Sequence, residues 1–255
     1  YRERSLGLGA MGFHSYLQSR RIPFEGIFAT GFNYKAFKHI KRHSVRATER
    51  LADERGESPD ISGSGKRNAH LLAVAPNASS SIICGGTSPS IEPYRANVYT
   101  HKTLSGSFQV KNKYLEEVLQ DKGLKKDELN VLWKDIAGKE GSVQHLDILT
   151  DEEKEVFKTA NEIDQIWIVE HASKRQEFIC QAQSVNLFFT IPTATEPQEV
   201  HDEYMQYVND VHWYGMNKLK SLYYFRTNAA RNAENVNTKV QRIKLDDAEC
   251  IACEG

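Results

Sequence analysis

The sequence predicts an α/β fold with a parallel sheet, and three features support this prediction. Residues 68–75 and 186–192 are nearly continuous apolar runs, which are typical of strands buried on both faces. Residues 199–219 place apolar side chains on one stripe with the 3.6-residue period of a helix. A short aromatic run follows at residues 222–225. Strand, helix and strand in this order form a βαβ unit, whose two strands lie parallel.

Two helices are expected before the first of these strands. Residues 5–18 carry an apolar pattern that suits a helix, although three nearby glycines weaken it. Residues 32–55 form a second amphipathic run, which Gly56 and Pro59 end. The strand at residues 68–75 is then stopped by Pro76.

Further helices are expected between the two buried strands. Residues 113–135 have a helical pattern that breaks at Gly123, and the many charged residues there indicate a surface excursion. Residues 151–157 begin with acidic side chains, as the first turn of a helix favours. Residues 162–180 continue as a long helix.

Composition limits the classes of function. The chain has 255 residues, a formal charge of −1, 40% hydrophobic and 26% charged residues, which excludes a disordered tail, a collagen-like fibre or a disulfide scaffold. The 33 Lys and Arg against 34 Asp and Glu leave no surplus of cations for sequence-independent DNA binding. The basic cluster at residues 35–43 borders an apolar stripe and indicates a solvated helix face. Without a long apolar run or a secretory signal, we expect a cytoplasmic protein with no membrane or nucleic-acid partner.

The turn after the first buried strand is the candidate ligand site. It holds asparagine, alanine and three serines, followed by a glycine-rich segment at residues 84–90. A buried strand that opens into small hydroxyl residues can present backbone N–H and side-chain O–H groups to a ligand. Taken singly, a serine-rich turn is more often a plain turn.

The four cysteines fall into two groups. Cys84 and Cys180 stand in apolar settings, where a free thiol behaves as a small buried hydrophobe. Cys250 and Cys253 form a CxxC pair beside the C-terminus, after a stretch with little apolar content. A lone CxxC is half a zinc site at best, and no histidine lies within a few residues of it. Three alternatives stay open for this pair: a redox shuttle, an inert pair of thiols and a zinc-binding tail.

Several short segments, taken in order, resemble the C-terminal part of the large (alpha) subunit of class I ribonucleotide reductase, most of all its phage-type members. The segments are residues 76–81, 90–93, 222–227 and 250–253, with flanking likeness at 4–9 and 181–187. The resemblance covers the chain apart from a variable stretch at residues 123–149.

The resemblance implies the C-terminal half of a ten-stranded α/β barrel, a fold that the family builds from two parallel half-barrels. Residues 1–227 would belong to the barrel, with a variable helical excursion at residues 110–160. Residues 228–255 would form a flexible redox tail that ends in the CxxC pair.

The resemblance also implies a reaction and its residues. Ribonucleoside diphosphates would be reduced to deoxyribonucleoside diphosphates by radical chemistry, for DNA synthesis. Tyr223 and Tyr224 would relay the oxidising equivalent, while Leu222 and Phe225 keep water out. Cys250 and Cys253 would re-reduce the active site by thiol–disulfide exchange. The substrate diphosphate would be cradled by Pro76, Asn77, Ala78, Ser79, Ser80 and Ser81.

The partners implied by the resemblance supply what this sequence lacks. The family's Asn-x-Cys-x-Glu motif, which carries the radical cysteine, does not occur here. We therefore expect one piece of a divided large subunit, which requires an N-terminal part that also binds ATP and deoxynucleotide effectors. No cofactor or metal is expected on this chain. A small (beta) subunit would hold a dinuclear metal and a tyrosyl radical, and a thioredoxin or glutaredoxin would supply electrons. The alternative is a non-catalytic remnant that binds and regulates the reductase complex.

Overall fold

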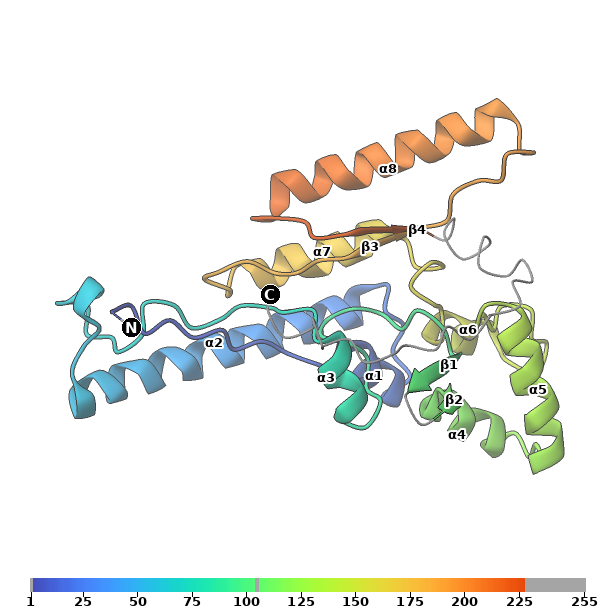
Figure 1. Cartoon of the computed structure of the whole chain (residues 1–255), viewed down its shortest axis with the longest axis horizontal. Coiled ribbons are helices and arrows are strands. Elements are labelled where there is room, and N and C mark those ends of the chain that lie inside the picture. Colours follow the sequence, from blue (N-terminus) through green and yellow to red (C-terminus); the bar gives the residue numbers. More distant parts are fainter. Residues whose placement is uncertain (1, 104–105, 228–255) are drawn as a thin grey trace, which may run out of the picture.

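The computed structural model describes residues 2–103 and 106–227, which form a mixed α/β structure (Figure 1). Two strands pair as an antiparallel hairpin and two more pair in parallel. The elements in chain order are α1 (Phe13–Ser19), α2 (Ile27–Arg55), a 3-10 turn (Pro59–Ile61), α3 (Ala78–Ile83), β1 (Val98–Thr103), β2 (Gly106–Lys111), α4 (Lys113–Asp121), α5 (Lys126–Gly138), α6 (Asp151–Val156), α7 (Gln165–Gln176), β3 (Leu187–Phe189), α8 (Gln198–Lys218) and β4 (Phe225–Thr227).

Four extended segments lie side by side and parallel, which confirms the predicted parallel arrangement. Residues 5–8 pair with residues 70–73, and the Leu8–Leu72 bridge is parallel. The far edge of the second segment pairs with residues 181–184 through the parallel Val74–Gln183 bridge. The chain then continues into β3, which pairs in parallel with β4. Helices connect each segment to the next, as parallel pairing requires.

The prediction of a helix over residues 5–18 was wrong for its first half. The helix begins only at Phe13, and the preceding residues form the first extended segment. The glycines explain the difference, because a Cβ at Gly9 would lie 2.8 Å from the Ala73 carbonyl oxygen. A backbone that approaches this closely has no room for a side chain.

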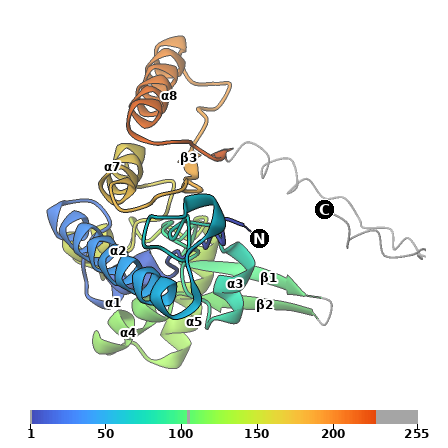
Figure 2. The same ribbon diagram turned by 90° about the vertical axis from the view of Figure 1, so that its left-hand side faces the viewer.

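The long helices stack in a row, with α7 between α2 and α8 in both views (Figures 1 and 2). Helix α2 starts five residues before the predicted residue 32 and ends, as predicted, at Gly56. Helix α7 is shorter than the predicted 162–180, whereas α8 matches the predicted 199–219 within one residue at each end. The apolar faces of these elements close over the extended segments in one core, which includes Leu17, Phe24, Leu72, Val169, Leu187 and Phe188.

A fully buried arginine ties α2, α7 and the third extended segment together. Arg175 of α7 donates from Nε to Gln183 Oε1 at 2.7 Å and from one terminal nitrogen to Asn33 Oδ1 at 3.1 Å. Its guanidinium lies 6.0 Å and 5.8 Å from the ring centroids of Phe13 and Phe37. Burial lowers the pKa of Arg175 to about 9, so the side chain still carries its charge at neutral pH. The cation is thus solvated by amides and aromatic faces.

The predicted surface excursion has a core of its own. Helices α4 and α5, separated at Gly123 as predicted, pack with the unpredicted β1–β2 hairpin and α6. Trp133 is 1% exposed at the centre of this second core, which also contains Leu115, Leu119, Ile136, Val143 and Phe157. The charged residues noted in the sequence cover its outside.

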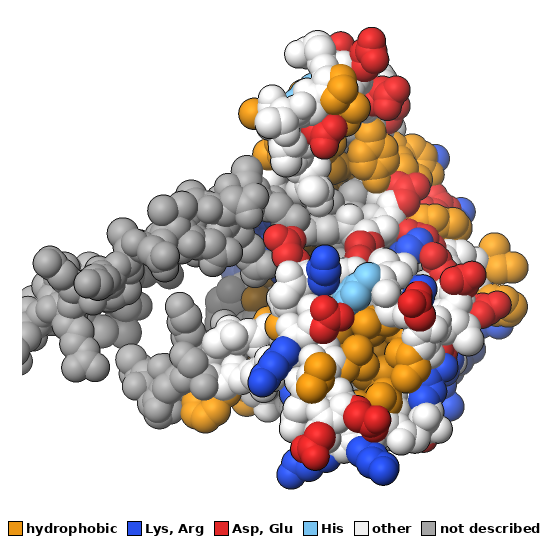
Figure 3. All heavy atoms as spheres, turned by 90° about the vertical axis from the view of Figure 1, so that its right-hand side faces the viewer, with side chains coloured by type: hydrophobic (Ala, Val, Ile, Leu, Met, Phe, Trp, Pro, Cys, Tyr) orange, Lys and Arg blue, Asp and Glu red, His pale blue; other side chains and the backbone are white. Residues whose placement is uncertain are grey.

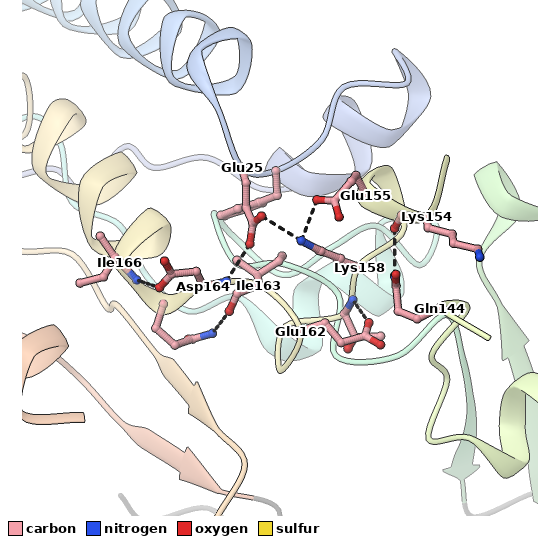
Figure 4. Close-up of polar contacts among 12 residues, drawn as sticks. Glu25, Gln144, Lys154, Glu155, Lys158, Glu162, Ile163, Asp164 and Ile166 are labelled. Carbon is pink, nitrogen blue, oxygen red and sulfur yellow. Dashed lines mark hydrogen bonds and ion pairs between the residues drawn. The ribbon is translucent and has the colours of Figure 1, made fainter. Parts of the chain in front are cut away.

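A polar junction joins the two cores (Figure 4). Lys158 Nζ lies 3.0 Å from Glu25 Oε2 and 2.6 Å from Glu155 Oε2. The other oxygen of Glu25 accepts a hydrogen bond from the Asp164 backbone nitrogen at 2.7 Å. Glu25 therefore holds the loop before α2 against the chain that leads from α6 into α7.

The surface carries charges of both signs. Lys and Arg side chains alternate with Asp and Glu on the face drawn in Figure 3. Lys35, Lys38 and Arg42 are exposed on α2, which confirms the predicted solvated helix face. No helix within the described residues combines the length and the apolar run needed to cross a membrane.

Gly141, in the turn after α5, packs its backbone closely against a neighbouring segment, and a substitution can test this contact. Gly141 has φ +84°, and a Cβ there would lie 2.5 Å from Ala96 Cβ and 2.9 Å from the Asn97 backbone nitrogen. We expect Gly141→Ala to lower the free energy of unfolding by about 2–4 kcal/mol through strain and overpacking. Gly138→Ala in α5 is the matched control, since a Cβ there meets nothing within 4 Å and should stabilise the helix by about 0.5–1 kcal/mol. Urea unfolding of the two variants measures the difference, and equal stabilities would contradict it.

Candidate functional site

A pocket of about 370 Å³ forms where the second extended segment ends and the third and fourth begin. Its walls come from residues 73–76, 181–184 and 221–223. Pro76 and Tyr223 both line it, although they lie far apart in the sequence. The structure therefore brings the first residue of the predicted diphosphate turn and the first predicted relay tyrosine to one site.

The predicted ligand turn is partly helical. Asn77 adopts a left-handed conformation with φ 49° and ψ 30°, and α3 begins at the next residue. The left-handed residue turns the chain sharply away from the strand. Ser79 and Ser80 are exposed and free to offer hydroxyl groups, whereas Ser81 is buried and donates to the Ala78 carbonyl oxygen.

The two predicted relay tyrosines lie against each other. The ring centroids of Tyr223 and Tyr224 are 4.1 Å apart, with 47° between the ring planes. Tyr223 is 47% and Tyr224 52% exposed in this chain. A hydrogen bond to the Tyr224 side chain raises the pKa of Tyr223, so the Tyr223 phenol holds its proton at neutral pH.

Strand pairing fixes the backbone of this tyrosine pair. The Tyr223 nitrogen donates to the Val185 carbonyl oxygen at 2.9 Å, and the Leu187 nitrogen donates to the Tyr224 carbonyl oxygen at 2.9 Å. Phe225 stacks on Phe189 with ring centroids 5.5 Å apart. Phe225 is nevertheless 42% exposed, so the predicted exclusion of water by Leu222 and Phe225 is incomplete within the described residues.

A buried carboxyl group lies behind the tyrosine pair. Glu92 Oε1 accepts a hydrogen bond from Asn186 Nδ2 at 2.6 Å, and Asn186 Oδ1 accepts one from the Tyr224 nitrogen at 3.3 Å. Glu92 is 6% exposed. Burial raises the pKa of Glu92 to about 7, although the Asn186 bond and the charges of Arg226 and Arg95 act to lower it. Sequence analysis gave Glu92 and Asn186 no role; Glu92 stood within the segment 90–93 that carried the family likeness.

Buried hydroxyl groups hold the segment that carries Glu92. Ser15 Oγ accepts from the Ser88 nitrogen at 2.7 Å and from Thr87 Oγ1 at 2.9 Å, and lies 2.6 Å from the Tyr94 hydroxyl. The Tyr94 nitrogen donates to Nδ1 of His14 at 2.9 Å. Burial lowers the pKa of His14 to about 3, which keeps this ring neutral and able to accept. Helix α1 is thus the support on which the segment rests.

The cysteines differ from the sequence prediction. Cys84 is exposed, because it follows α3 on the outer side of the turn, so its assignment as a buried thiol was wrong. Cys180 is half-buried, and its sulfur accepts hydrogen bonds from the Leu71 and Leu72 nitrogens at 3.1 Å and 3.3 Å. Burial acts to raise the pKa of Cys180, but these bonds together with the charge of Lys41 outweigh it, and the pKa is lowered. Cys250 and Cys253 lie outside the described residues.

No cluster of three or more histidine, cysteine, aspartate or glutamate side chains with metal-binding geometry occurs in the part of the chain that the structure describes. The candidate site is therefore built from hydroxyls, phenols, amides and one buried carboxyl group.

Comparison with known proteins defines the class. The family model described as "Ribonucleotide reductase, barrel domain" matches residues 1–64 and 57–225. The chain belongs to this family, as the resemblance found in the sequence predicts.

The matching relatives are large subunits of the reductase. The chain is 43% identical over 257 residues to the ribonucleoside-diphosphate reductase large subunit of Invertebrate iridescent virus 3, covering 99% of this chain. It is 45% identical to the putative large subunit of Frog virus 3, again over 99% of the chain. The solved Actinobacillus ureae class Id ribonucleotide reductase alpha subunit superposes with a TM-score of 0.74 at 40% identity, covering 89% of this chain.

The chain spans about two fifths of the length of these relatives, namely 39% and 42% of the two viral proteins and 40% of the solved chain. Viral proteins are prominent among them, and the likeness to phage-type members in particular stays a prediction. The similarity supports the half-barrel fold and places the described structure within the barrel of a class I large subunit.

The buried carboxyl group predicts a pH-dependent stability. Since the pKa of Glu92 rises from 4.5 unfolded to about 7 folded, the folded protein binds more protons between these values and loses stability as pH rises through them. Glu92→Gln should therefore be more stable relative to wild type at pH 8 than at pH 5, by up to roughly 3 kcal/mol. Urea unfolding at both pH values measures this difference. The exposed Glu203→Gln is the control, and an equal pH effect in both variants would contradict the assignment.

Proposed function

We propose that this chain acts as the C-terminal part of a class I ribonucleotide reductase large subunit, which reduces ribonucleoside diphosphates to deoxyribonucleoside diphosphates. The observation that carries the proposal is the single pocket that Pro76 and Tyr223 line together. A substrate-anchoring turn and a redox-active phenol have to meet at one site for such chemistry, and the family membership supplies the class of reaction.

The turn at residues 76–81 would hold the diphosphate. The exposed hydroxyls of Ser79 and Ser80 can donate to phosphate oxygens, and small side chains let the backbone approach closely. No lysine or arginine is needed for this contact, because the backbone N–H groups of the turn add to the donors.

The phenols of Tyr223 and Tyr224 would pass an oxidising equivalent between a partner small subunit and the active site. Oxidation of a phenol at neutral pH releases a proton together with the electron, and ring contact lets one phenol hand both to the next. Their half-exposed state fits a role at a surface that further protein covers.

Other groups would come from partners. The remaining part of the large subunit would supply the radical cysteine and the effector site for ATP and deoxynucleotides. A small subunit would supply the dinuclear metal and tyrosyl radical, and Cys250 and Cys253 would exchange with a thioredoxin or glutaredoxin. The alternative of a regulatory remnant has no need of the relay or the dithiol.

The relay and the dithiol are tested by reconstituted turnover. With the complementing N-terminal part, the small subunit and thioredoxin present, Tyr224→Phe should abolish reduction of ribonucleoside diphosphates, because phenylalanine has no phenolic proton to lose. Cys250→Ser with Cys253→Ser should stop turnover with thioredoxin after the first cycle. Tyr16→Phe, at an exposed position outside the site, is the matched control. Unchanged turnover in the site variants would favour the regulatory remnant.

The diphosphate turn is tested by substrate affinity. Each hydrogen bond to a charged group contributes about 1.5–3 kcal/mol, so Ser80→Ala should raise KM for the ribonucleoside diphosphate on the order of tenfold to a hundredfold. The effect on kcat should be smaller, since the reacting ribose lies away from the phosphates. Ser62→Ala, in the exposed loop after the 3-10 turn, is the control. A KM for Ser80→Ala equal to that of the control would remove the turn from the substrate site.

A further inference from the structure

The amide of Asn186 joins two groups that the chain brings together from distant positions. Its nitrogen donates to Glu92 Oε1 at 2.6 Å, and its oxygen accepts from the Tyr224 backbone nitrogen at 3.3 Å. Asn186 is 2% exposed, so neither end of the amide exchanges freely with water. The acceptor on Glu92 therefore fixes which way the amide faces, and the amide in turn holds the backbone of Tyr224.

The charges around Glu92 also connect it to the phenol. The Arg226 guanidinium lies 5.2 Å from the Tyr224 ring centroid and acts on the Glu92 carboxyl group together with Arg95. An ionised Glu92 balances the cation that faces the ring, whereas a protonated Glu92 leaves it unbalanced. Because Glu92 is 6% exposed, a change in its charge acts strongly on neighbouring groups.

We propose that Glu92 and Asn186 are positioning residues for the tyrosine pair, with Asn186 holding the Tyr224 backbone and Glu92 fixing the Asn186 amide and balancing the charge of Arg226. This inference rests on the proposed function, because Glu92 and Asn186 are assigned a role in the relay that the two tyrosines would form. Neither residue touches the reacting groups. Both act through the placement of Tyr224 and the field at its ring.

Ionisation of Glu92 makes the electrostatic field at the Tyr224 ring depend on pH. Burial raises the pKa of Glu92 to about 7, so its ionisation falls in the neutral range. His212, whose ring centroid lies 5.6 Å from that of Phe225, is another titratable group beside this strand. A test must separate the two.

The experiment places 4-fluorophenylalanine at position 224 of the full chain, bound to its complementing part, and follows the fluorine NMR shift with pH. This probe has no proton that titrates near neutral pH. With Glu92 present, we expect one step with a midpoint near pH 7. Glu92→Gln, which keeps an oxygen acceptor for Asn186, should remove the step, and Glu203→Gln and His212→Gln should keep it. A step that persists in Glu92→Gln, or is lost in His212→Gln, would overturn the proposal.

Asn186→Ala provides a second reading of the same probe. It removes the amide between Glu92 and Tyr224 and should at least halve the size of the step while leaving its midpoint near pH 7. A step of unchanged size would show that the amide does not connect the two groups. If this variant does not fold, the Glu92→Gln result still decides.

Turnover separates this inference from the proposed function. With the native Tyr224 in the reconstituted reductase, Glu92→Gln should lower kcat on the order of tenfold with KM nearly unchanged, and should remove the limb of the kcat profile near pH 7. If the fluorine step depends on Glu92 but the wild type shows no reductase activity, the proposed function fails, whereas the positioning of Tyr224 by Glu92 and Asn186 is supported. If wild type is active and Glu92→Gln has the same kcat profile, the pair has no role in the relay.

Discussion

The site depends on the parallel pairing of residues 185–187 with residues 223–224. Two backbone hydrogen bonds of 2.9 Å set this register. A shift by one residue would move each tyrosine side chain to the other face of the sheet. The neighbouring pairing of residues 72–74 with 181–184 sets where Pro76 leaves the sheet. Because both pairings share the third extended segment, the ligand turn and the tyrosines are placed relative to each other by backbone geometry alone.

Buried polar groups keep this sheet in place. Arg175 donates to Gln183 of the third segment and to Asn33 of α2, so a displaced third segment would leave the buried cation without one of its two acceptors, at a cost of several kcal/mol. Displacing the later part of the same segment would likewise break the buried hydrogen bond between Asn186 and Glu92. Apolar packing favours many arrangements, whereas satisfied polar groups in a core favour one.

The tyrosine pair is exposed in a chain that represents only part of the length of its relatives. Tyr223 and Tyr224 are about half exposed, and the chain spans about two fifths of its relatives. The proposed relay would work in a low dielectric, so the half-exposed phenols call for further protein around them. Within the described residues, Val185, Leu187 and Asn186 hold the backbone of the tyrosine pair through hydrogen bonds.

Local pattern determined much of this protein. The apolar runs and the 3.6-residue stripe of α8 are short-range features, and they predicted the extended segments and the helix. The hydroxyl turn after Pro76 and the adjacent phenols are also short-range features, but α3 makes the turn partly helical. Tertiary structure decided the rest. Residues 5–8 pair as a strand because Gly9 lets the backbone approach Ala73, and Glu92 meets Asn186 across 94 residues of sequence. Contacts between distant segments depend on tertiary packing, and periodicity and composition predict only local structure.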